Sequence, residues 1–323
     1  MPIKINSHGL QAVLVILVLA LVPIFVHSPY VLHLAVMSMI FSVLTMSWNF
    51  INGYSGIFTF GHQAFFALGA YGSALVAMNF GLSPWATLWV GVLLGGLAGL
   101  LIGLPVLRIR SIAHIAIITL VFAEVVRLCI ANLPELTRGT LGLSSIPVFD
   151  PLVIGGEPWV TFDVSSRIGS YYLILLIVAI TLGIIIRLLN GRTGLALKAI
   201  RDSEDAAESL GIDLVRYKLI VFVISSMLAG LAGAFYAHYL GVLTPESTAA
   251  VDIMILILTM TLIGGTGTIF GPILGAFVII FGLEQLRAIG NYRMMVYGLA
   301  LVIFVLFWPK GLIQFFRRRP ARN

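Results

Sequence analysis

Residues 190–218 read NGRTGLALKAIRDSEDAAESLGIDLVRYK and form the most polar stretch of a chain that otherwise suits a lipid bilayer. Apolar residues make up 60% of the 323 residues and charged residues only 10%, and the mean hydropathy is +1.08. A long charged segment between membrane spans must lie in water, because unpaired polar groups are costly in hydrocarbon. The stretch is therefore a candidate surface for contact with a soluble partner protein.

The rest of the chain predicts an all-α polytopic membrane protein with a single transmembrane domain over residues 1–323. A bilayer core of about 30 Å needs about 20 helical residues to cross it. We expect about ten transmembrane helices, some of them broken by glycine. The eighth run is short, so the sequence leaves open whether it crosses completely. The predicted runs are 10–26, 30–50, 61–80, 84–106, 111–131, 170–189, 217–240, 251–264, 269–288 and 293–309.

The distribution of basic residues predicts the orientation. An even number of spans puts both termini on one side, together with 14 of the 19 Lys and Arg residues, and leaves the other 5 on the far side. The positive-inside rule makes the richer side cytoplasmic, so we expect cytoplasmic termini. The loop 190–218 is then cytoplasmic and the loop 132–169 extracytoplasmic. The net charge of +6 reflects this topology and anionic lipid headgroups, and we expect no nucleic-acid partner.

Glycines recur every four residues at Gly91, Gly95, Gly99 and Gly103. Small residues at this spacing line one face of a helix and let another backbone approach closely. We interpret this stripe as a helix-packing surface.

Two glycine-rich interruptions lie in opposite halves of the chain, GYSG at 53–56 and GGTG at 264–267. Paired interruptions of this kind point to a transport site, because unwound backbone is tolerated in a membrane only where it lines a cavity or is buried in protein. Chance similarity between glycine-rich helices is the alternative. The second interruption contributes Gly265 and Gly267 as candidate pathway residues.

A polar strip flanks the first interruption. Its side chains either offer hydrogen bonds to a passing zwitterion or satisfy backbone groups that the glycines leave free. The strip consists of Asn49, Asn52, Ser55, Thr59, His62 and Gln63.

Ionisable residues inside spans are costly and become functional candidates by default. Glu124 and Arg127 are three apart on one predicted helix, as are Glu284 and Arg287, so each pair can neutralise itself. We interpret the second pair as structural. Glu124 lies deeper and is a candidate for the translocation pathway or for a hydrogen bond between helices.

No chemistry is predicted for the chain itself. The sequence has no G-x-x-x-x-G-K-[ST] phosphate loop, no H-E-x-x-H and no G-x-S-x-G motif. The spacing of Cys, His and Asp suggests no metal site, and we expect no cofactor. The protein is predicted not to be an enzyme, so any ATP hydrolysis would belong to a partner.

Residues 205–211, DAAESLG, resemble the [E/D]-A-A-x-x-x-G core of the cytoplasmic loop signature of ATP-binding-cassette (ABC) importer permeases. Small alanines let a short helix sit close to a partner, and the glycine can end that helix in a left-handed conformation. An exposed amphipathic helix could contain the same heptad by accident. The Leu-Pro that follows in the commonest signature is absent, and Val221-Phe-Val223 stands there instead.

The resemblance extends over residues 45–312 to the LivM-type permease subunits of branched-chain amino acid ABC importers. It rests on NGYSG (52–56), LPVLRIR (104–110), TLVFAE (119–124), GRTG (191–194), AIRD (199–202), LGI (210–212) and GGTG (264–267). Urea and short-amide permeases are close relatives, so the resemblance does not fix the substrate. An ion-coupled secondary transporter and a channel-like facilitator are the alternatives from other classes, and both leave the charged loop without a role.

The resemblance implies a permease domain in a bacterial inner membrane that works as part of a complex. The implied partners are a second related permease, two cytoplasmic ATPases and an extracytoplasmic substrate-binding protein. It also implies that the cytoplasmic loop couples to the ATPases through Arg201, Asp205, Ala206, Ala207 and Gly211.

Overall fold

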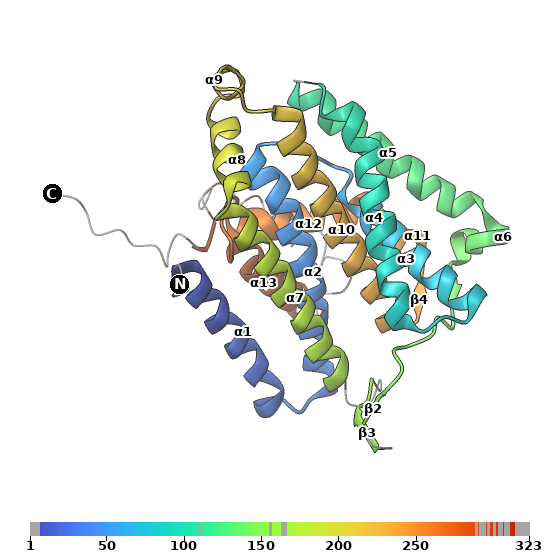
Figure 1. Cartoon of the computed structure of the whole chain (residues 1–323). Coiled ribbons are helices and arrows are strands. Elements are labelled where there is room, and N and C mark those ends of the chain that lie inside the picture. Colours follow the sequence, from blue (N-terminus) through green and yellow to red (C-terminus); the bar gives the residue numbers. More distant parts are fainter. Residues whose placement is uncertain are drawn as a thin grey trace.

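The computed structural model is an α-helical bundle (Figure 1). It describes residues 7–109, 111–154, 157–162 and 167–287, and beyond these only 290, 295, 298–299, 302, 306 and 311–313. The long helices are α1 (Ser7–Phe25), α2 (Pro29–Asn49), α3 (His62–Phe80), α4 (Pro84–Val106), α5 (Ile112–Asn132), α7 (Ile168–Leu189), α10 (Leu214–Leu240), α12 (Val251–Gly264) and α13 (Gly271–Gln285). The shorter ones are η1, a π-helical turn (Phe50–Tyr54), α6 (Pro134–Thr137), η2 (Gly139–Leu141), α8 (Arg192–Asp202), α9 (Glu204–Ser209) and α11 (Pro245–Thr248).

Nine of the ten predicted apolar runs coincide with these long helices, and the tenth, 293–309, lies mostly outside the described residues. Within the described part of the chain, six helical segments are long and apolar enough to cross a membrane. The polytopic helical class is therefore confirmed, while the number ten stays a prediction. The six segments are Pro29–Tyr54, Pro84–Val106, Ile112–Asn132, Ile168–Leu189, Leu214–Leu240 and Pro245–Gly264.

The loop expected at 132–169 is not purely irregular, because it contributes to two small antiparallel ribbons. Strand β1 (Leu143–Ser144) pairs with β4 (Val242–Leu243), and β2 (Leu152–Ile154) pairs with β3 (Glu157–Val160). Glycines 155 and 156 separate β2 from β3 in the sequence, which is a typical hairpin spacing. We call this side of the bundle the ribbon end and the opposite side the α8–α9 end.

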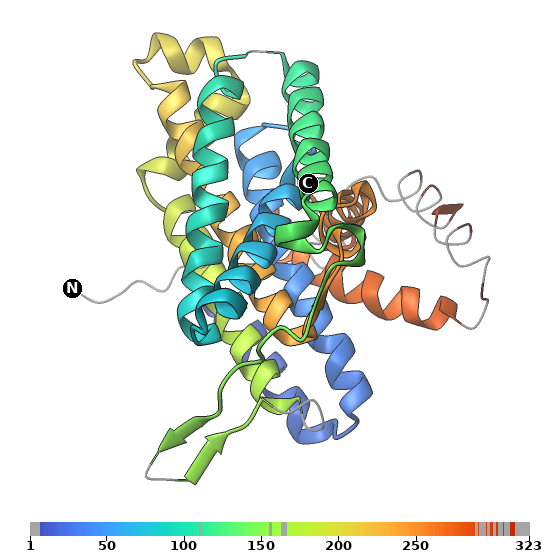
Figure 2. The same ribbon diagram turned by 90° about the vertical axis from the view of Figure 1, so that its right-hand side faces the viewer.

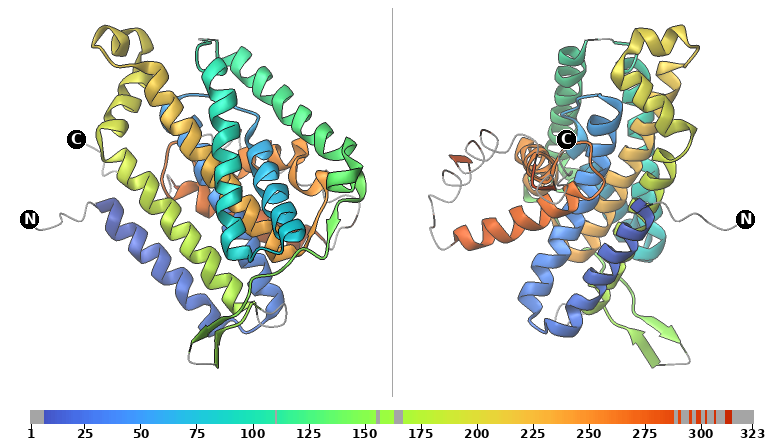
Figure 3. Two further views of the ribbon diagram at one scale, coloured as in Figure 1. Left: turned by 45° about the vertical axis from the view of Figure 1, so that its right-hand side comes forward. Right: turned by 90° about the vertical axis from the view of Figure 1, so that its left-hand side faces the viewer.

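Helices α1 to α5, α7 and α10 run alternately between these two ends (Figures 1 and 3). Ser83, just before α4, donates a hydrogen bond to Asp150 at 2.7 Å, which places the α3–α4 turn at the ribbon end. Tyr171, near the start of α7, donates to the Leu19 carbonyl at 2.6 Å, which places the end of α1 there too. At the other end, a cavity of about 730 Å³ is lined by both Leu10 and Ile313. The two described extremes of the chain therefore lie near the same end of the bundle.

The closest packing joins α3, α4 and α10 through glycine. A Cβ on Gly91 would lie 2.6 Å from the Ala234 Cβ, and one on Gly99 would lie 2.5 Å from the Ser226 hydroxyl oxygen. Distances this short leave no room for a side chain. The predicted packing role of the glycine stripe on α4 is confirmed.

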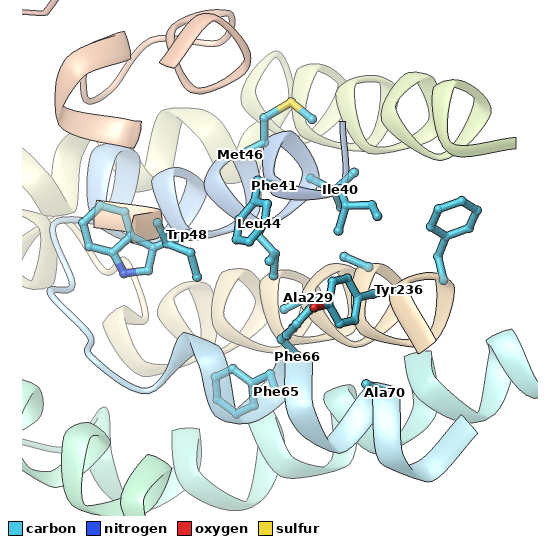
Figure 4. Close-up of a cluster of buried hydrophobic side chains, with 14 of the residues drawn as sticks. Ile40, Phe41, Leu44, Met46, Trp48, Phe65, Phe66, Ala70, Ala229 and Tyr236 are labelled. Carbon is cyan, nitrogen blue, oxygen red and sulfur yellow. The ribbon is translucent and has the colours of Figure 1, made fainter. Parts of the chain in front are cut away.

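The apolar core lies between α2, α3 and α10 (Figure 4). Trp48 from α2, Phe65 and Phe66 from α3, and Ala229 from α10 are fully buried there. The indole nitrogen of Trp48 donates to the Thr59 carbonyl at 2.9 Å, so the core also holds the segment that links α2 to α3. By contrast, α1, α4 and α5 expose large apolar side chains on their outer faces, as expected for contact with lipid or another membrane protein.

Helix α12 differs in direction from its neighbours. Figure 2 shows it almost end-on, while α4 and α5 are seen from the side, so α12 runs across the bundle. Its 14 residues span about 21 Å at 1.5 Å per residue. This is shorter than a hydrocarbon core of about 30 Å. Only together with α11, as the 20-residue segment Pro245–Gly264, does it reach membrane length.

Candidate functional site

The first predicted interruption separates α2 from α3. Helix α2 passes into the π-helical turn η1, and the chain is then non-helical until α3 begins at His62. Gly56 has φ = 73°, a left-handed conformation that favours glycine. Ser55 donates to the Ile51 carbonyl at 2.6 Å, and the Thr59 hydroxyl accepts from the Gly61 amide at 3.2 Å. These two side chains satisfy backbone groups at the break, as one of the two sequence interpretations expects.

The second interruption separates α12 from α13. Gly265 and Gly267 have φ values of 117° and 69°. The Thr268 hydroxyl donates to the Gly265 carbonyl at 2.7 Å and accepts from the Gly271 amide at 3.1 Å, so Thr268 organises the turn. Leu312, near the end of the chain, donates its amide to the Ile263 carbonyl at 2.8 Å and holds the turn from the other side.

The two interruptions lie against each other, although more than 200 residues separate them. Asn49 donates from Nδ2 to the Thr268 carbonyl and accepts at Oδ1 from the Gly267 amide, both at 2.8 Å. A Cβ on Gly53 would lie 2.6 Å from the Gly267 nitrogen, so the backbones touch. Asn49 is only 2% exposed. One buried side chain therefore connects both broken segments.

A third segment reaches this junction from the charged loop. Arg201, in the last turn of α8, donates from Nη1 to the Gly53 carbonyl at 2.5 Å. The same nitrogen lies 3.3 Å from the position that a Cβ on Gly267 would occupy. The sequence interpretation placed Arg201 among the contacts to an ATPase, whereas its guanidinium points into the bundle, at the point where the interruptions meet.

The remaining polar residues of the strip differ in their surroundings. Within the described structure His62 pairs through Nε2 with the Ser47 hydroxyl at 2.7 Å. The His62 Nδ1 and both polar atoms of the Gln63 amide are buried without a hydrogen-bond partner among the described residues. Asn52 is half-buried on η1. Their predicted role in translocation stays a prediction.

Glu124 is not part of this junction. It lies on α5 and is 40% exposed, and Arg127 donates to it in a pair with a shortest distance of 2.5 Å. The structure thus places the pair on the outer side of the bundle, surrounded by exposed apolar residues such as Val121 and Val125. Glu284 forms the corresponding pair with Arg287 at 3.2 Å, as predicted.

The helix predicted within the charged loop is α9, and local signals define both of its ends. The Ser203 hydroxyl accepts from the Ala206 amide at 3.3 Å and caps its start. At its end the Gly211 amide donates to the Glu208 carbonyl and the Ile212 amide to the Ala207 carbonyl. Gly211 has φ = 79°, so it ends the helix in a Schellman motif, as the sequence predicts.

Helix α9 presents a mixed surface at the outermost part of the α8–α9 end (Figures 1 and 2). Asp205 and Ala206 are exposed, and Leu210 is 79% exposed although it is a large apolar residue. Ala207 is fully buried. The methyl group of Ala207 packs within the chain and Ala206 lies on the surface, and the predicted coupling role of both alanines stays a prediction.

The charged loop is held firmly against α10. Lys218 is nearly buried, and its ammonium group donates to Glu204 at 2.6 Å. A cavity of about 480 Å³ lies between α9, the start of α10 and the α4–α5 turn, with Arg108 and Glu208 on its walls. The loop therefore projects from the bundle while a side-chain ion pair connects it to α10.

A bundle of membrane-length helices, two broken segments in contact and a charged helical projection together define a membrane transport protein of the permease class. The chain belongs to the family described as branched-chain amino acid transport system / permease component, which its residues 30–306 match. This confirms the resemblance inferred from the sequence motifs. No solved structure matches the chain.

The chain is similar over most of its length to characterised permeases. It is 35% identical to the high-affinity branched-chain amino acid transport system permease protein LivM of Escherichia coli (strain K12), covering 94% of this chain and 74% of the relative. It is 22% identical to the permease protein LivH of the same strain, and the match covers 84% of this chain and 91% of that relative. A permease of an autoinducer 2 import system, LsrC of Enterobacter sp. (strain 638), is 28% identical over 62% of this chain.

Two contributors to the junction were not predicted from the sequence. Thr268 was recognisable, because threonine side chains commonly bond nearby backbone groups in turns, as its hydroxyl does with the Gly271 amide. The approach of Leu312 to Ile263 carries no local signal, since it joins residues that only the folded chain brings together.

Proposed function

We propose that this chain is one of the two membrane-spanning subunits of an ABC importer that carries branched-chain amino acids, or closely related ones, across a bacterial inner membrane. The observation that carries the proposal is α9, a short capped helix in a charged projection, with Leu210 exposed at its C-terminal end. An exposed apolar residue in such a place favours a protein partner. The similarity to LivM supports the class of substrate.

In this proposal the α8–α9 end is cytoplasmic. Basic residues at this end support that orientation under the positive-inside rule. They include Arg108, Arg187, Arg192, Lys198, Arg201, Arg216 and Lys218. The ribbon end then faces the substrate-binding protein, and α9 faces the ATPases.

Transport requires no covalent step in this chain. Nucleotide binding closes the partner ATPases, which move α9 and shift the bundle between outward-open and inward-open states. The energy enters as the different affinity of the complex for nucleotide in the two states. Asp205, Ala206 and Gly211 contribute to the ATPase contact, through charge, exposed surface and the helix end.

The second permease covers the outer face of α5. A charged pair surrounded by lipid is costly, and Glu124 and Arg127 lie on that face with 40% and 28% of their side chains exposed. A second permease, or the aqueous path between the two, would remove that cost. This arrangement places Glu124 beside the substrate path, as the sequence interpretation suggested.

Replacing Glu124 with Gln is expected to reduce uptake about 10-fold at equal membrane levels, because it leaves the Arg127 charge without its partner at the interface. Uptake of labelled substrate and the amount of protein in the membrane are measured together. Glu284→Gln is the matched control and is expected to retain uptake. It removes the charge from an i,i+3 pair whose Arg287 is 70% exposed, while the glutamine oxygen can still accept the hydrogen bond from Tyr30. Wild-type uptake by the Glu124 variant would assign the pair to packing.

Replacing Leu210 with Asp is expected to abolish co-purification of the ATPases, because it puts a charge where the proposed contact buries an apolar side chain. The chain is expressed with candidate ATPase partners and captured by a tag. Leu195→Asp makes the same change at a 69% exposed leucine on α8 and is expected to retain the ATPases. Equal capture by both variants would contradict the coupling role of α9, and no capture by the unaltered chain would count against the proposed function as a whole.

A further inference from the structure

We propose that Arg201 is the mechanical link between the ATPase-facing helix α9 and the two broken segments, rather than a contact to the ATPase itself. This inference rests on the proposed function and identifies which side chain passes the movement into the bundle. Arg201 is a positioning residue here, because it acts through the backbone of the interruptions and not on the substrate.

Arg201 binds a backbone carbonyl that the helix end leaves without an amide donor among the described residues. Within a continuous helix the Gly53 carbonyl would accept from an amide four residues later, but the chain leaves the helix at Gly56. The Gly53 oxygen is therefore one of the carbonyls that a helix end leaves open. The negative end of the α2–η1 dipole also favours a cation at this place. A guanidinium from α8 takes the position that a helical donor would otherwise occupy.

Arg201 is close to α9 along the chain. It lies in the last turn of α8, and only Ser203 separates α8 from α9. Ser203 ends α8 by donating its amide to the Ala199 carbonyl and starts α9 by accepting from the Ala207 amide. Because one residue serves both helices, a displacement of α9 is passed directly to the backbone that carries Arg201.

Arg201 contacts both interruptions at the junction where they meet. The guanidinium bonds the first interruption at Gly53 and lies against the second at Gly267. Asn49 connects the same second interruption back to α2 through two hydrogen bonds. A movement of Arg201 therefore acts on α2, α12 and α13 together, which are the elements that contain the glycine breaks.

A lysine cannot reproduce this geometry fully. Arginine presents a planar fork of donors, whereas lysine offers a compact charge on a flexible stem. Lysine would keep the attraction to the Gly53 carbonyl and lose the flat surface beside Gly267. The conservative variant is thus expected to restore part of the function that alanine removes.

The test uses the complete complex with its second permease, ATPases and binding protein, reconstituted in lipid vesicles. For Arg201→Ala we expect normal co-purification of the ATPases and ATP hydrolysis within about 2-fold of the unaltered complex. The number of substrate molecules transported per ATP is expected to fall about 10-fold, which corresponds to the loss of one hydrogen bond to a charged group. Arg201→Lys is expected to lie between the two.

Arg192→Ala is the matched control, because it removes the same exposed charge from the first turn of the same helix α8. It is expected to leave the transport-to-hydrolysis ratio unchanged. Loss of ATPase capture by Arg201→Ala would overturn the proposal in favour of a direct ATPase contact. An unchanged number of substrate molecules transported per ATP in Arg201→Ala would overturn it as well. This holds whether the rates of transport and hydrolysis both stay the same or both fall. Failure of the unaltered chain to capture any ATPase would instead reject the proposed function.

Discussion

Replacing Asn49 with Leu is expected to abolish substrate uptake while the protein still inserts into the membrane. Leucine has a similar size but makes neither of the two hydrogen bonds, to the Gly267 amide and to the Thr268 carbonyl. A backbone group that loses its partner costs about 1–3 kcal/mol when it is fully buried, and less at this part-buried junction. The loss of both bonds therefore weakens the junction of the broken segments by about 10-fold, since 1.4 kcal/mol corresponds to a factor of 10.

The measurement is uptake in vesicles, with the membrane level and thermal stability of each variant determined in parallel. Asn49→Asp separates the two bonds, because a carboxylate still accepts from Gly267 but cannot donate to Thr268. Ser55→Ala is the control at the same break, since the Ser55 hydroxyl bonds the local Ile51 carbonyl and no other group among the described residues. Wild-type uptake by Asn49→Leu would show that transport does not depend on contact between the two interruptions.

The parts of the site that could be predicted from the sequence are those with local causes. The ends of α9 follow from Ser203 and from the left-handed Gly211, and both act within a few residues. The glycine spacing on α4 predicted a packing face because helical periodicity places such residues in one row. The two interruptions were also recognisable, because glycine and polar residues break otherwise continuous apolar runs.

The sequence could not show how these parts meet. The bond from Arg201 to Gly53 joins residues 148 apart in sequence, and the bonds from Asn49 to the second interruption join residues more than 200 apart. Their partners are backbone atoms, which carry no residue-specific signal. The burial of Ala207 could not be predicted for a related reason, since a small residue on a short helix suits an internal contact as well as an external one.

The position of Glu124 along its span does not determine which side of the helix the carboxylate faces. The sequence placed a carboxylate well inside a span, and that placement is consistent with α5 in the structure. Which side of the helix it faces depends on how α5 packs against α3 and α4. The structure turns Glu124 outward, so its environment depends on whatever covers α5.

Replacing Gly95 with Leu is expected to lower the stability of the bundle. Any Cβ at this position would overlap the Ser226 carbonyl and would lie 3.1 Å from the Gly230 Cα, both of which belong to the backbone of α10. Backbone atoms cannot move aside as a flexible side chain can, so the two helices must separate. Gly230 in turn lies against Gly91 and Gly69, and a shift there disturbs the packing of α3 as well.

Overpacking of this kind typically costs 1–3 kcal/mol, and here it acts on backbone in three helices at once. We expect the thermal unfolding midpoint of the purified protein to fall by about 4 °C. Gly183→Leu is the matched control, because it makes the same substitution within the long helix α7 at an exposed glycine whose Cβ would meet no atom within 4 Å. A midpoint for Gly95→Leu equal to that of Gly183→Leu would mean that α4 and α10 are not held together by backbone contact along this stripe.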